Sequence, residues 1–371
     1  MDAGACHRVL MPKPDHMNLK TAWGKLTNWE RWHYNVKYAL LSPVWLWYSL
    51  RAGSFYFFTP ANPTLTFGGF EGGPKGEIYD LLPQELIPRS IYVDAAWTMP
   101  QVEAALQEAG LHYPVAVKPL VGMMGLLFRK VDNEAQLALY HHTVPVPYII
   151  QELVTYPLEV SVFYYRQPGR PRGTITGFVR KEALEVVGDG AKTLEELIEE
   201  LSGRPGFYAE EWKAKHRARL HEVLPAGEVF KLSWVANLSR GARLVSLAHE
   251  IDEDLLALFD RISHAARHLY YGRYDIKCAS VADLKKGKQF TILEFNGTGA
   301  EPHHVYGNGN TFMQAARILA QHWGALASIA RYHHRLGTPY KSLREGLRFT
   351  RSANRHFRKL KALDKALPVF D

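Results

Sequence analysis

Residues 271–299 constrain the fold of this chain more than any other segment. Two apolar stretches, YGRYDIKC and FTILEFN, flank a polar turn, which predicts a β-hairpin. Asp275 lies on the first stretch, and Glu294 and Asn296 lie two residues apart on the second, so that these two share a strand face. An acid and an amide on an apolar strand are costly to bury without a cation or donors. The pattern therefore predicts an Mg²⁺ site with three oxygen ligands.

A second cluster contains a lysine and two glycines. An apolar strand predicted at 114–118 ends in Lys118, and the following turn contains Gly122 and Gly125. A lysine at a strand end can meet phosphate oxygens as a point charge, and glycines let backbone N–H groups approach the same phosphates. The cluster indicates a phosphate site. The alternative is a plain hairpin with an exposed lysine.

A third cluster joins two predicted strands through a short linker. Glu152 ends the first strand and Glu159 begins the second. Backbone at such a crossover can pair with an adenine edge, and Glu159 can accept hydrogen bonds from ribose hydroxyls. The alternative is two solvated carboxylates at strand ends.

Apolar spacing and turn residues predict an α+β chain, in which strands and helices are mixed. The predicted strands lie at 88–93, 114–118, 125–131, 147–152, 158–165, 173–180, 228–236, 271–280 and 288–295. The predicted helices lie at 75–82, 99–109, 132–140, 251–270 and 310–330, and a further one follows the capping sequence at 189–193.

The composition permits two or three packed lobes, because 47% of the 371 residues are apolar and only 22% are charged. The two cysteines, Cys6 and Cys278, exclude a disulfide framework and fit a reducing cytosol. Pro43 and Arg51 interrupt the most apolar stretch, 38–58, and its uncharged core, 38–50, is shorter than the roughly 20 apolar residues that a spanning helix needs. We therefore expect a cytoplasmic chain without a signal peptide or a transmembrane helix.

The two ends of the chain differ from its middle. Residues 331–371 contain eleven basic and three acidic residues, which accounts for the whole net charge of +8. They read as a basic amphipathic helix, and residues 1–70 read as aromatic-rich helices. Such segments suit weak peripheral contact with an anionic membrane, here its inner face. The alternative is that both simply pack on the body or remain solvated. Nucleic-acid binding is disfavoured because no matching module accompanies the tail.

In chain order, these clusters resemble the ATP-grasp superfamily, especially D-alanine–D-alanine ligases and the ATP-grasp part of cyanophycin synthetases. VAVKP is similar to the phosphate-lysine strand, IIQELV…LEV to the adenine crossover, and RYDIK…ILEFNGTG to the metal motif. VVGDGAKTLEELI and the later ANLSRGARL resemble cyanophycin-synthetase segments. The resemblance covers residues 70–330 and implies two α/β lobes with the nucleotide between them.

The resemblance implies a nucleotide-binding role for each matching residue. Lys118 would bind the α- and β-phosphates, and Lys75 matches an earlier ATP lysine. Gly122 and Gly125 fall in the loop that closes over the phosphates. Glu152 and the backbone of Val154 would contact adenine, and Glu159 would contact ribose. Lys181 would contact phosphate, and Arg180 is the alternative for this role.

The resemblance also implies the metal and catalytic residues. Asp275, Glu294 and Asn296 would hold Mg²⁺. Arg273 would face an acyl phosphate and the tetrahedral intermediate. The predicted catalytic set is Arg273, Lys118 and Lys181, and the loop Gly297–Gly299 would shape the acceptor site.

The implied activity is an ADP-forming carboxylate–amine ligase that uses Mg-ATP and small-molecule substrates. The carboxylate would attack the γ-phosphorus, and an amine would then attack the acyl phosphate. The alternatives are an ATP-grasp kinase and a non-catalytic nucleotide-binding protein associated with membranes. Relatives are often dimers or tetramers, so a homo-oligomer is also expected.

The sequence departs from the family in two places. Aromatic helices at 1–70 replace the usual N-terminal α/β domain, which argues against D-alanine as substrate. After Asn296, the sequence GTGAEPHHVYGNGN makes Glu301, His303 and His304 candidates for an unfamiliar acceptor site, although a packed histidine pair is the alternative. We predict an extension at 1–70, an ATP-grasp domain at 71–330 and a helical tail at 331–371.

Overall fold

The computed structural model describes residues 29–202, 204 and 207–370. The chain divides into two units, Met1–Leu40 and Leu41–Asp371. In the first unit, the described residues form the short 3-10 helix η1 (Trp29–Arg31) and the start of helix α2 (Tyr34–Ala52). The aromatic helix expected further upstream, around Trp23, lies outside the described residues.

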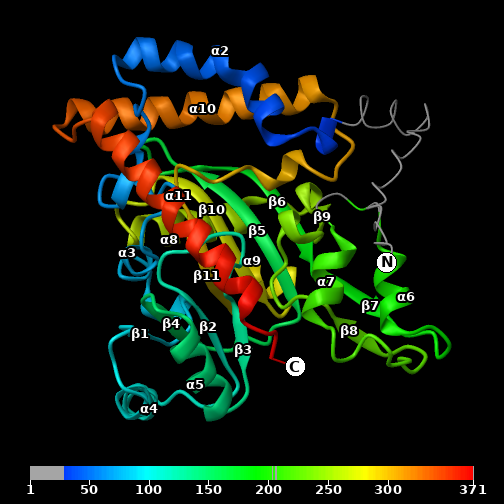
Figure 1. Ribbon diagram of the computed structural model, residues 1–371. Helices are drawn as coiled ribbons and strands as arrows, with labels where there is room; N and C mark the ends of the chain where they lie inside the picture. The colour runs from blue at the N-terminus through cyan, green and yellow to red at the C-terminus, as the bar shows by residue number, and fades with distance from the viewer. Residues whose placement is uncertain (1–28, 203, 205–206, 371) are drawn as a thin grey trace, which may run out of the picture. The chain divides into compact units, whose positions relative to one another are not determined.

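One sheet of the second unit has four antiparallel strands. Its order is β1-β4-β2-β3, drawn in cyan and green in Figure 1. Its apolar side chains share a core with two helices and with the C-terminal end of the last helix. The elements are β1 (Ser90–Val93), β2 (Val115–Pro119), β3 (Arg129–Val131), β4 (Tyr148–Glu152), α4 (Met99–Glu108), α5 (Glu134–Thr143) and α11 (Leu343–Ala366).

A second, five-stranded antiparallel sheet has the order β11-β10-β5-β6-β9. Alternate residues point to opposite faces, and a different helix covers each face. Val162 and Tyr274 pack with α8, whereas Phe163 and Tyr271 pack with α10. The elements are β5 (Leu158–Tyr165), β6 (Thr174–Glu182), β9 (Arg243–Ser246), β10 (Tyr271–Cys278), β11 (Phe290–Asn296), α8 (Glu253–Ala265) and α10 (Phe312–Arg335).

A small two-stranded sheet with its own apolar core stands beside them. Thr193 caps its first helix through a capping box with Glu196, as the sequence predicts. The elements are β7 (Glu185–Val187), β8 (Val229–Lys231), α6 (Leu194–Glu199) and α7 (Ala209–Lys215).

The predicted α+β class is confirmed, with local corrections. The connection between β10 and β11 is not a plain turn, because Ser280 caps a short helix, α9 (Val281–Lys285). The strand predicted at 125–131 begins only at Arg129, because Met124 and Leu127 have positive φ. The strand predicted at 228–236 is limited to β8, and the helix predicted at 75–82 to α3 (Gly76–Tyr79).

Helix α11 is not a free tail. Leu360 is buried in the core of the four-stranded sheet, together with Leu367 and Phe370. Figure 1 shows α11 descending in red past the strands toward the C-terminus. No helix among the described residues is long and apolar enough to cross a membrane. The domain boundaries at 70 and 330 stay predictions.

Two histidines, one buried and one half-buried, lie between α10 and the five-stranded sheet. His322 on α10 is 3% exposed, and neither of its ring nitrogens has a hydrogen-bond partner among the described residues. The His304 ring is centred 5.5 Å away. Burial lowers the pKa of His322 to about 3 and that of His304 to about 4. Both are therefore neutral in the folded chain at neutral pH.

We predict that this pair makes folding sensitive to acid. The unfolded chain binds protons below its histidine pKa of about 6.5, whereas the folded chain does not, so stability falls as pH decreases from about 6.5 toward 4. His322→Leu removes one buried unpaired group and should flatten this dependence. Urea denaturation at pH 7 and pH 5 measures it, with exposed His249→Leu as the control. An equal pH dependence in the wild type and His322→Leu would contradict the prediction.

Candidate functional site

The register of the five-stranded sheet gathers charged residues on one face. Asp275 on β10 lies opposite Glu294 on β11 and opposite Ser161 on β5. On the next pair of strands, Glu159 of β5 lies opposite Lys181 of β6. Ser161 and Asp275 are each an even number of residues from Phe163 and Tyr271, which face α10. The polar residues therefore lie on the same face of the sheet as the apolar residues that contact α10, nearer to one end of the strands.

Asp275 is the centre of this face and is only 5% exposed. Ser161 Oγ donates to its carboxylate, Asn296 Nδ2 donates at 3.1 Å, and the Arg273 guanidinium donates two hydrogen bonds of 3.2 Å. Lys181 Nζ lies 3.6 Å away. Burial opposes ionisation, but Arg273 and Lys181 outweigh it and hold the pKa of Asp275 well below its usual value.

Two lysines from other parts of the chain reach strand β11. Lys75, at the start of α3, forms an ion pair with Glu294. Lys118, on β2 of the four-stranded sheet, donates to Tyr79 Oη at 2.8 Å and to the Leu293 carbonyl at 3.3 Å. Burial lowers the pKa of Lys118 to about 8, against the opposing effect of Glu294. The structure thus brings both predicted phosphate lysines to the predicted metal strand.

The residues predicted for adenine and ribose are engaged by other side chains. Glu159 pairs with Lys181 at 2.9 Å, and the Val154 carbonyl accepts from Lys277 Nζ at 3.1 Å. Burial lowers the pKa of Lys181, but Asp275 and Glu159 outweigh it and raise the pKa overall. Glu152 pairs instead with Arg89 at the surface, 3.0 Å away. Lys181 therefore joins Glu159 to the Asp275 cluster. Glu152 does not take part in this cluster, because its partner is Arg89.

Arg180, the alternative to Lys181 for the phosphate role, does not join the Asp275 cluster. Its guanidinium pairs with Glu182 at 2.6 Å, and it is more exposed than Lys181. Because alternate strand residues face opposite sides, Lys181 and not Arg180 joins the polar face.

Part of the loop between β2 and β3 has a left-handed backbone conformation, at one glycine and at two residues that carry side chains. Met124, Gly125 and Leu127 all have positive φ. The positive φ favours glycine at residue 125, and a Cβ there would be tight, at 3.0 Å from the Val235 side chain. A Cβ on Gly122 would make only ordinary contacts with Pro119 and Leu360.

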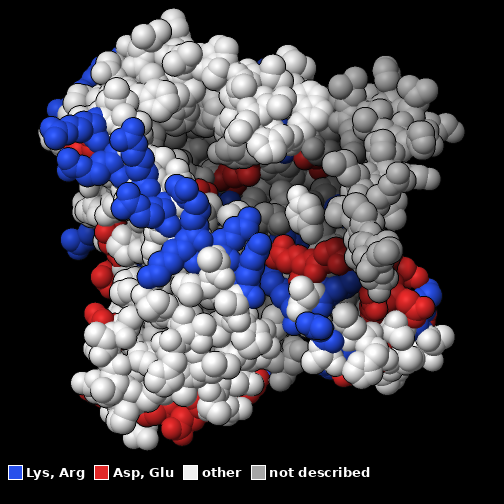
Figure 2. Space-filling model, in the orientation of Figure 1, with Lys and Arg blue, Asp and Glu red and all other residues white. Residues whose placement is uncertain are grey.

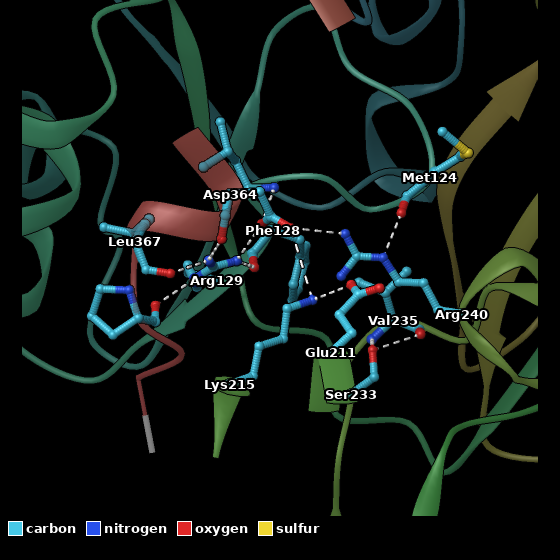
Figure 3. A network of polar contacts seen from close by, with 12 residues as sticks. Met124, Phe128, Arg129, Glu211, Lys215, Ser233, Val235, Arg240, Asp364 and Leu367 are labelled. Carbon is cyan, nitrogen blue, oxygen red and sulfur yellow. Dashed lines mark hydrogen bonds and ion pairs between the residues drawn. The ribbon is translucent and has the colours of Figure 1, made fainter. Parts of the chain in front are cut away.

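A buried acid on α11, which the sequence did not indicate, holds this loop (Figure 3). Asp364 accepts from the Leu127 amide at 2.8 Å and from Arg129 at 3.0 Å. Arg240 bridges Asp364, at 3.2 Å, and the Met124 carbonyl, at 2.8 Å. Burial raises the pKa of Asp364, but the neighbouring arginines lower it overall. The only signal in the sequence is an acid near the C-terminal end of a basic helix.

The loop after β11 lies against Arg273. The Arg273 guanidinium donates to the Glu301 carbonyl at 2.9 Å, and His303 Nδ1 lies 3.4 Å from Ser161 Oγ. Burial raises the pKa of Glu71, as does the nearby Glu301 charge, while Arg273 lowers it. Sequence reasoning missed Glu71. The structure places His303 beside the Asp275 cluster, whereas His304 packs against His322 of α10.

The predicted metal ligands fit Mg²⁺ by the chemistry of their donors. Two carboxylates and an amide offer hard oxygens, and Mg²⁺ usually takes its other ligands from phosphate and water. Asn296 turns its amide nitrogen to Asp275, and both Asp275 oxygens already accept hydrogen bonds. Across the described residues, no group of three or more His, Cys, Asp or Glu side chains could hold a metal by itself. A cation here would therefore need phosphate oxygens.

No protein-family profile matches the chain, and no curated protein matches it. The resemblance to ATP-grasp ligases recurs among solved structures at low similarity. The D-alanine–D-alanine ligase from Bacillus anthracis is 10% identical, with a TM-score of 0.39 over 71% of this chain and 69% of its own.

Two further structures are a bifunctional glutathione synthetase from Pasteurella multocida and the ATP-grasp ligase PsnB. Each is 14% identical over 67% of this chain, with TM-scores of 0.37 and 0.35. The match spans 36% of the synthetase and 60% of PsnB, so this chain covers less than two thirds of either.

We predict that Asp364→Ala destabilises the chain severely. It leaves the Arg129 guanidinium, which is 4% exposed, without its carboxylate, and breaking a buried pair in this way costs about 3–5 kcal/mol. Urea denaturation measures the loss. The control is exposed Lys365→Ala on the next residue, which should change stability by less than about 0.5 kcal/mol. A loss for Asp364→Ala as small as that of the control would refute the prediction.

Proposed function

We propose that this chain is an ADP-forming carboxylate–amine ligase of the ATP-grasp type. The observation that carries the proposal is that Lys75 and Lys118 both reach β11, where Lys75 pairs with Glu294 and Lys118 donates to the Leu293 carbonyl. Lys118 comes from the four-stranded sheet and Glu294 from the five-stranded sheet. Lysines from β2 and from the start of α3, beside the carboxylates of the five-stranded sheet, suit a polyphosphate that carries a divalent cation.

The residues that would hold Mg²⁺ are Glu294 and Asn296, with Asp275 beside them. Mg²⁺ would neutralise charge that develops on the transferred phosphoryl group. Lys118 would bind phosphate oxygens in its ammonium form, since its pKa of about 8 leaves it mostly charged at pH 7. An arriving phosphate would compete with Glu294 for Lys75, because both are anionic partners of the same ammonium group.

Arg273 would bind the substrate carboxylate and then the acyl phosphate. Its guanidinium is planar and donates to two oxygens at once, as carboxylate and phosphate recognition requires. Asp275 fixes the orientation of this guanidinium through two hydrogen bonds. Loop 122–128, held by Asp364, would cover the phosphates and exclude water that would hydrolyse the acyl phosphate.

The reaction has two steps. A carboxylate oxygen of the substrate bonds to the γ-phosphorus of ATP, and ADP leaves. The amine nitrogen then bonds to the acyl carbon, and inorganic phosphate leaves as the amide forms. The acidic side chains Glu71 and Glu301 near Arg273 would suit an acceptor that carries a cationic amino group nearby.

We predict that phosphate release from Mg-ATP requires both a carboxylic acid and an amine. Lys118→Met and Glu294→Gln should lower kcat/KM about 100-fold or more, because each removes a charge that acts on the transferred phosphoryl group. A panel of amino acids, short peptides and fatty acids, paired with amines, would test this in a phosphate-release assay.

The control for these variants is Lys288→Met, which alters an exposed lysine just before β11 and should leave the rate unchanged. Formation of ADP that needs the acid but not the amine, without phosphate release, would favour a kinase instead. ATP binding with no release for any pair would favour a non-catalytic nucleotide-binding protein.

A further inference from the structure

Helix α11 presents one strongly basic face. Eight of its Lys and Arg side chains are exposed, and none of the eight forms an ion pair with another described residue. They are Arg344, Arg348, Arg351, Arg355, Arg358, Lys359, Lys361 and Lys365. Figure 2 shows them as a continuous blue band that follows the course of α11 in Figure 1.

The opposite face of α11 is fixed to the protein. His356 contacts the Val121 carbonyl at 2.9 Å, Leu360 is buried in the core, and Asp364 is held by two arginines. The arginines at 344, 348, 351, 355 and 358 follow one another at intervals of three or four residues, which places them on one side of a helix. Packing therefore holds the basic side outward, so this surface is a permanent feature of the fold.

Little negative charge on α11 opposes this face. Its one exposed acid is Glu345, whose carboxylate accepts hydrogen bonds from the Ser342 amide and hydroxyl in a capping box. The other acid of the helix, Asp364, is buried. The basic side chains repel one another without a counter-charge, so an anionic surface that lies along the helix would relieve this repulsion.

Exposed apolar side chains gather at the N-terminal end of the basic face. Leu343 and Leu347 belong to the first turns of α11, and Leu336, which is 70% exposed, lies just before it. Tyr56, which follows α2, pairs its backbone with Lys341 just before α11, and Leu50 near the end of α2 is 79% exposed. Single exposed leucines are ordinary, but several beside a basic stripe are typical of a surface that rests in a membrane interface.

We propose that the basic face of α11 docks on an anionic membrane surface, with the leucines around residue 343 entering the interface. Anionic lipids attract clustered Lys and Arg side chains, and the acyl boundary accepts exposed leucines. Nucleic acid would also attract these Lys and Arg side chains, but it would not explain the exposed leucines beside them. This inference is independent of the ligase chemistry, because none of the eight Lys and Arg residues belongs to the candidate site.

The test is co-sedimentation of the full chain with vesicles of phosphatidylcholine alone and of phosphatidylcholine mixed with phosphatidylglycerol. Binding should require phosphatidylglycerol and should weaken as salt shortens the screening length from about 10 Å at 0.1 M to about 3 Å at 1 M. Combined replacement of Arg348, Arg351, Arg355 and Arg358 by Glu should weaken binding about tenfold or more. Combined replacement of the same four by Gln should weaken it less. Leu343→Ser with Leu347→Ser should weaken it without altering the charge.

The matched control replaces four exposed bases elsewhere, Arg217, Arg261, Lys286 and Lys288, by Glu, which changes the net charge equally. This control should keep its binding. Equal binding to both vesicle types, equal loss in the control, or unchanged binding by the α11 variants with Glu and with Gln would overturn the proposal. So would tighter binding to a DNA duplex than to the anionic vesicles at the same salt.

Discussion

The buried carboxylate of Asp275 is the interaction on which the rest of the site depends. A charge with 5% exposure is unfavourable unless cations and hydrogen bonds surround it. Its partners are Arg273 on the same strand, Ser161 on β5, Asn296 on β11 and Lys181 on β6. Four strands must keep their register to supply them. A slip of one residue would turn these groups to the opposite face and leave the charge unpaired.

Positive and negative side chains lie close together on both sides of Asp275. Lys181 joins Asp275 to Glu159, and on the other side Lys75 pairs with Glu294, with Lys118 close by. The hydrogen bond from Lys118 Nζ to the Leu293 carbonyl joins the four-stranded sheet to the five-stranded sheet, beside the ion pair of Lys75 and Glu294. Such pairs are strong where water is scarce, and they can be exchanged when a charged ligand arrives, which apolar contacts cannot do.

Helix α11 connects the surface with the loop that follows β2. Asp364 and His356 contact the backbone of residues 121–127, while the other side of the same helix carries eight Lys and Arg side chains that form no ion pair with a described residue. The loop needs support of this kind, because Met124 and Leu127 adopt positive φ, which is unfavourable for residues with side chains. The hydrogen bond from the Leu127 amide to a buried carboxylate helps to offset that cost.

The sequence alone determined what depends on local periodicity. It placed Glu294 and Asn296 on one face of a strand, put Lys118 near the end of another, and located the capping box at Thr193, because two-residue alternation and caps involve near neighbours. Only the tertiary structure decided the pairs that are distant in sequence. Lys75 and Glu294 are 219 residues apart, and Arg129 and Asp364 are 235. Which distant charges meet depends on how whole sheets and helices pack, and no local pattern encodes that.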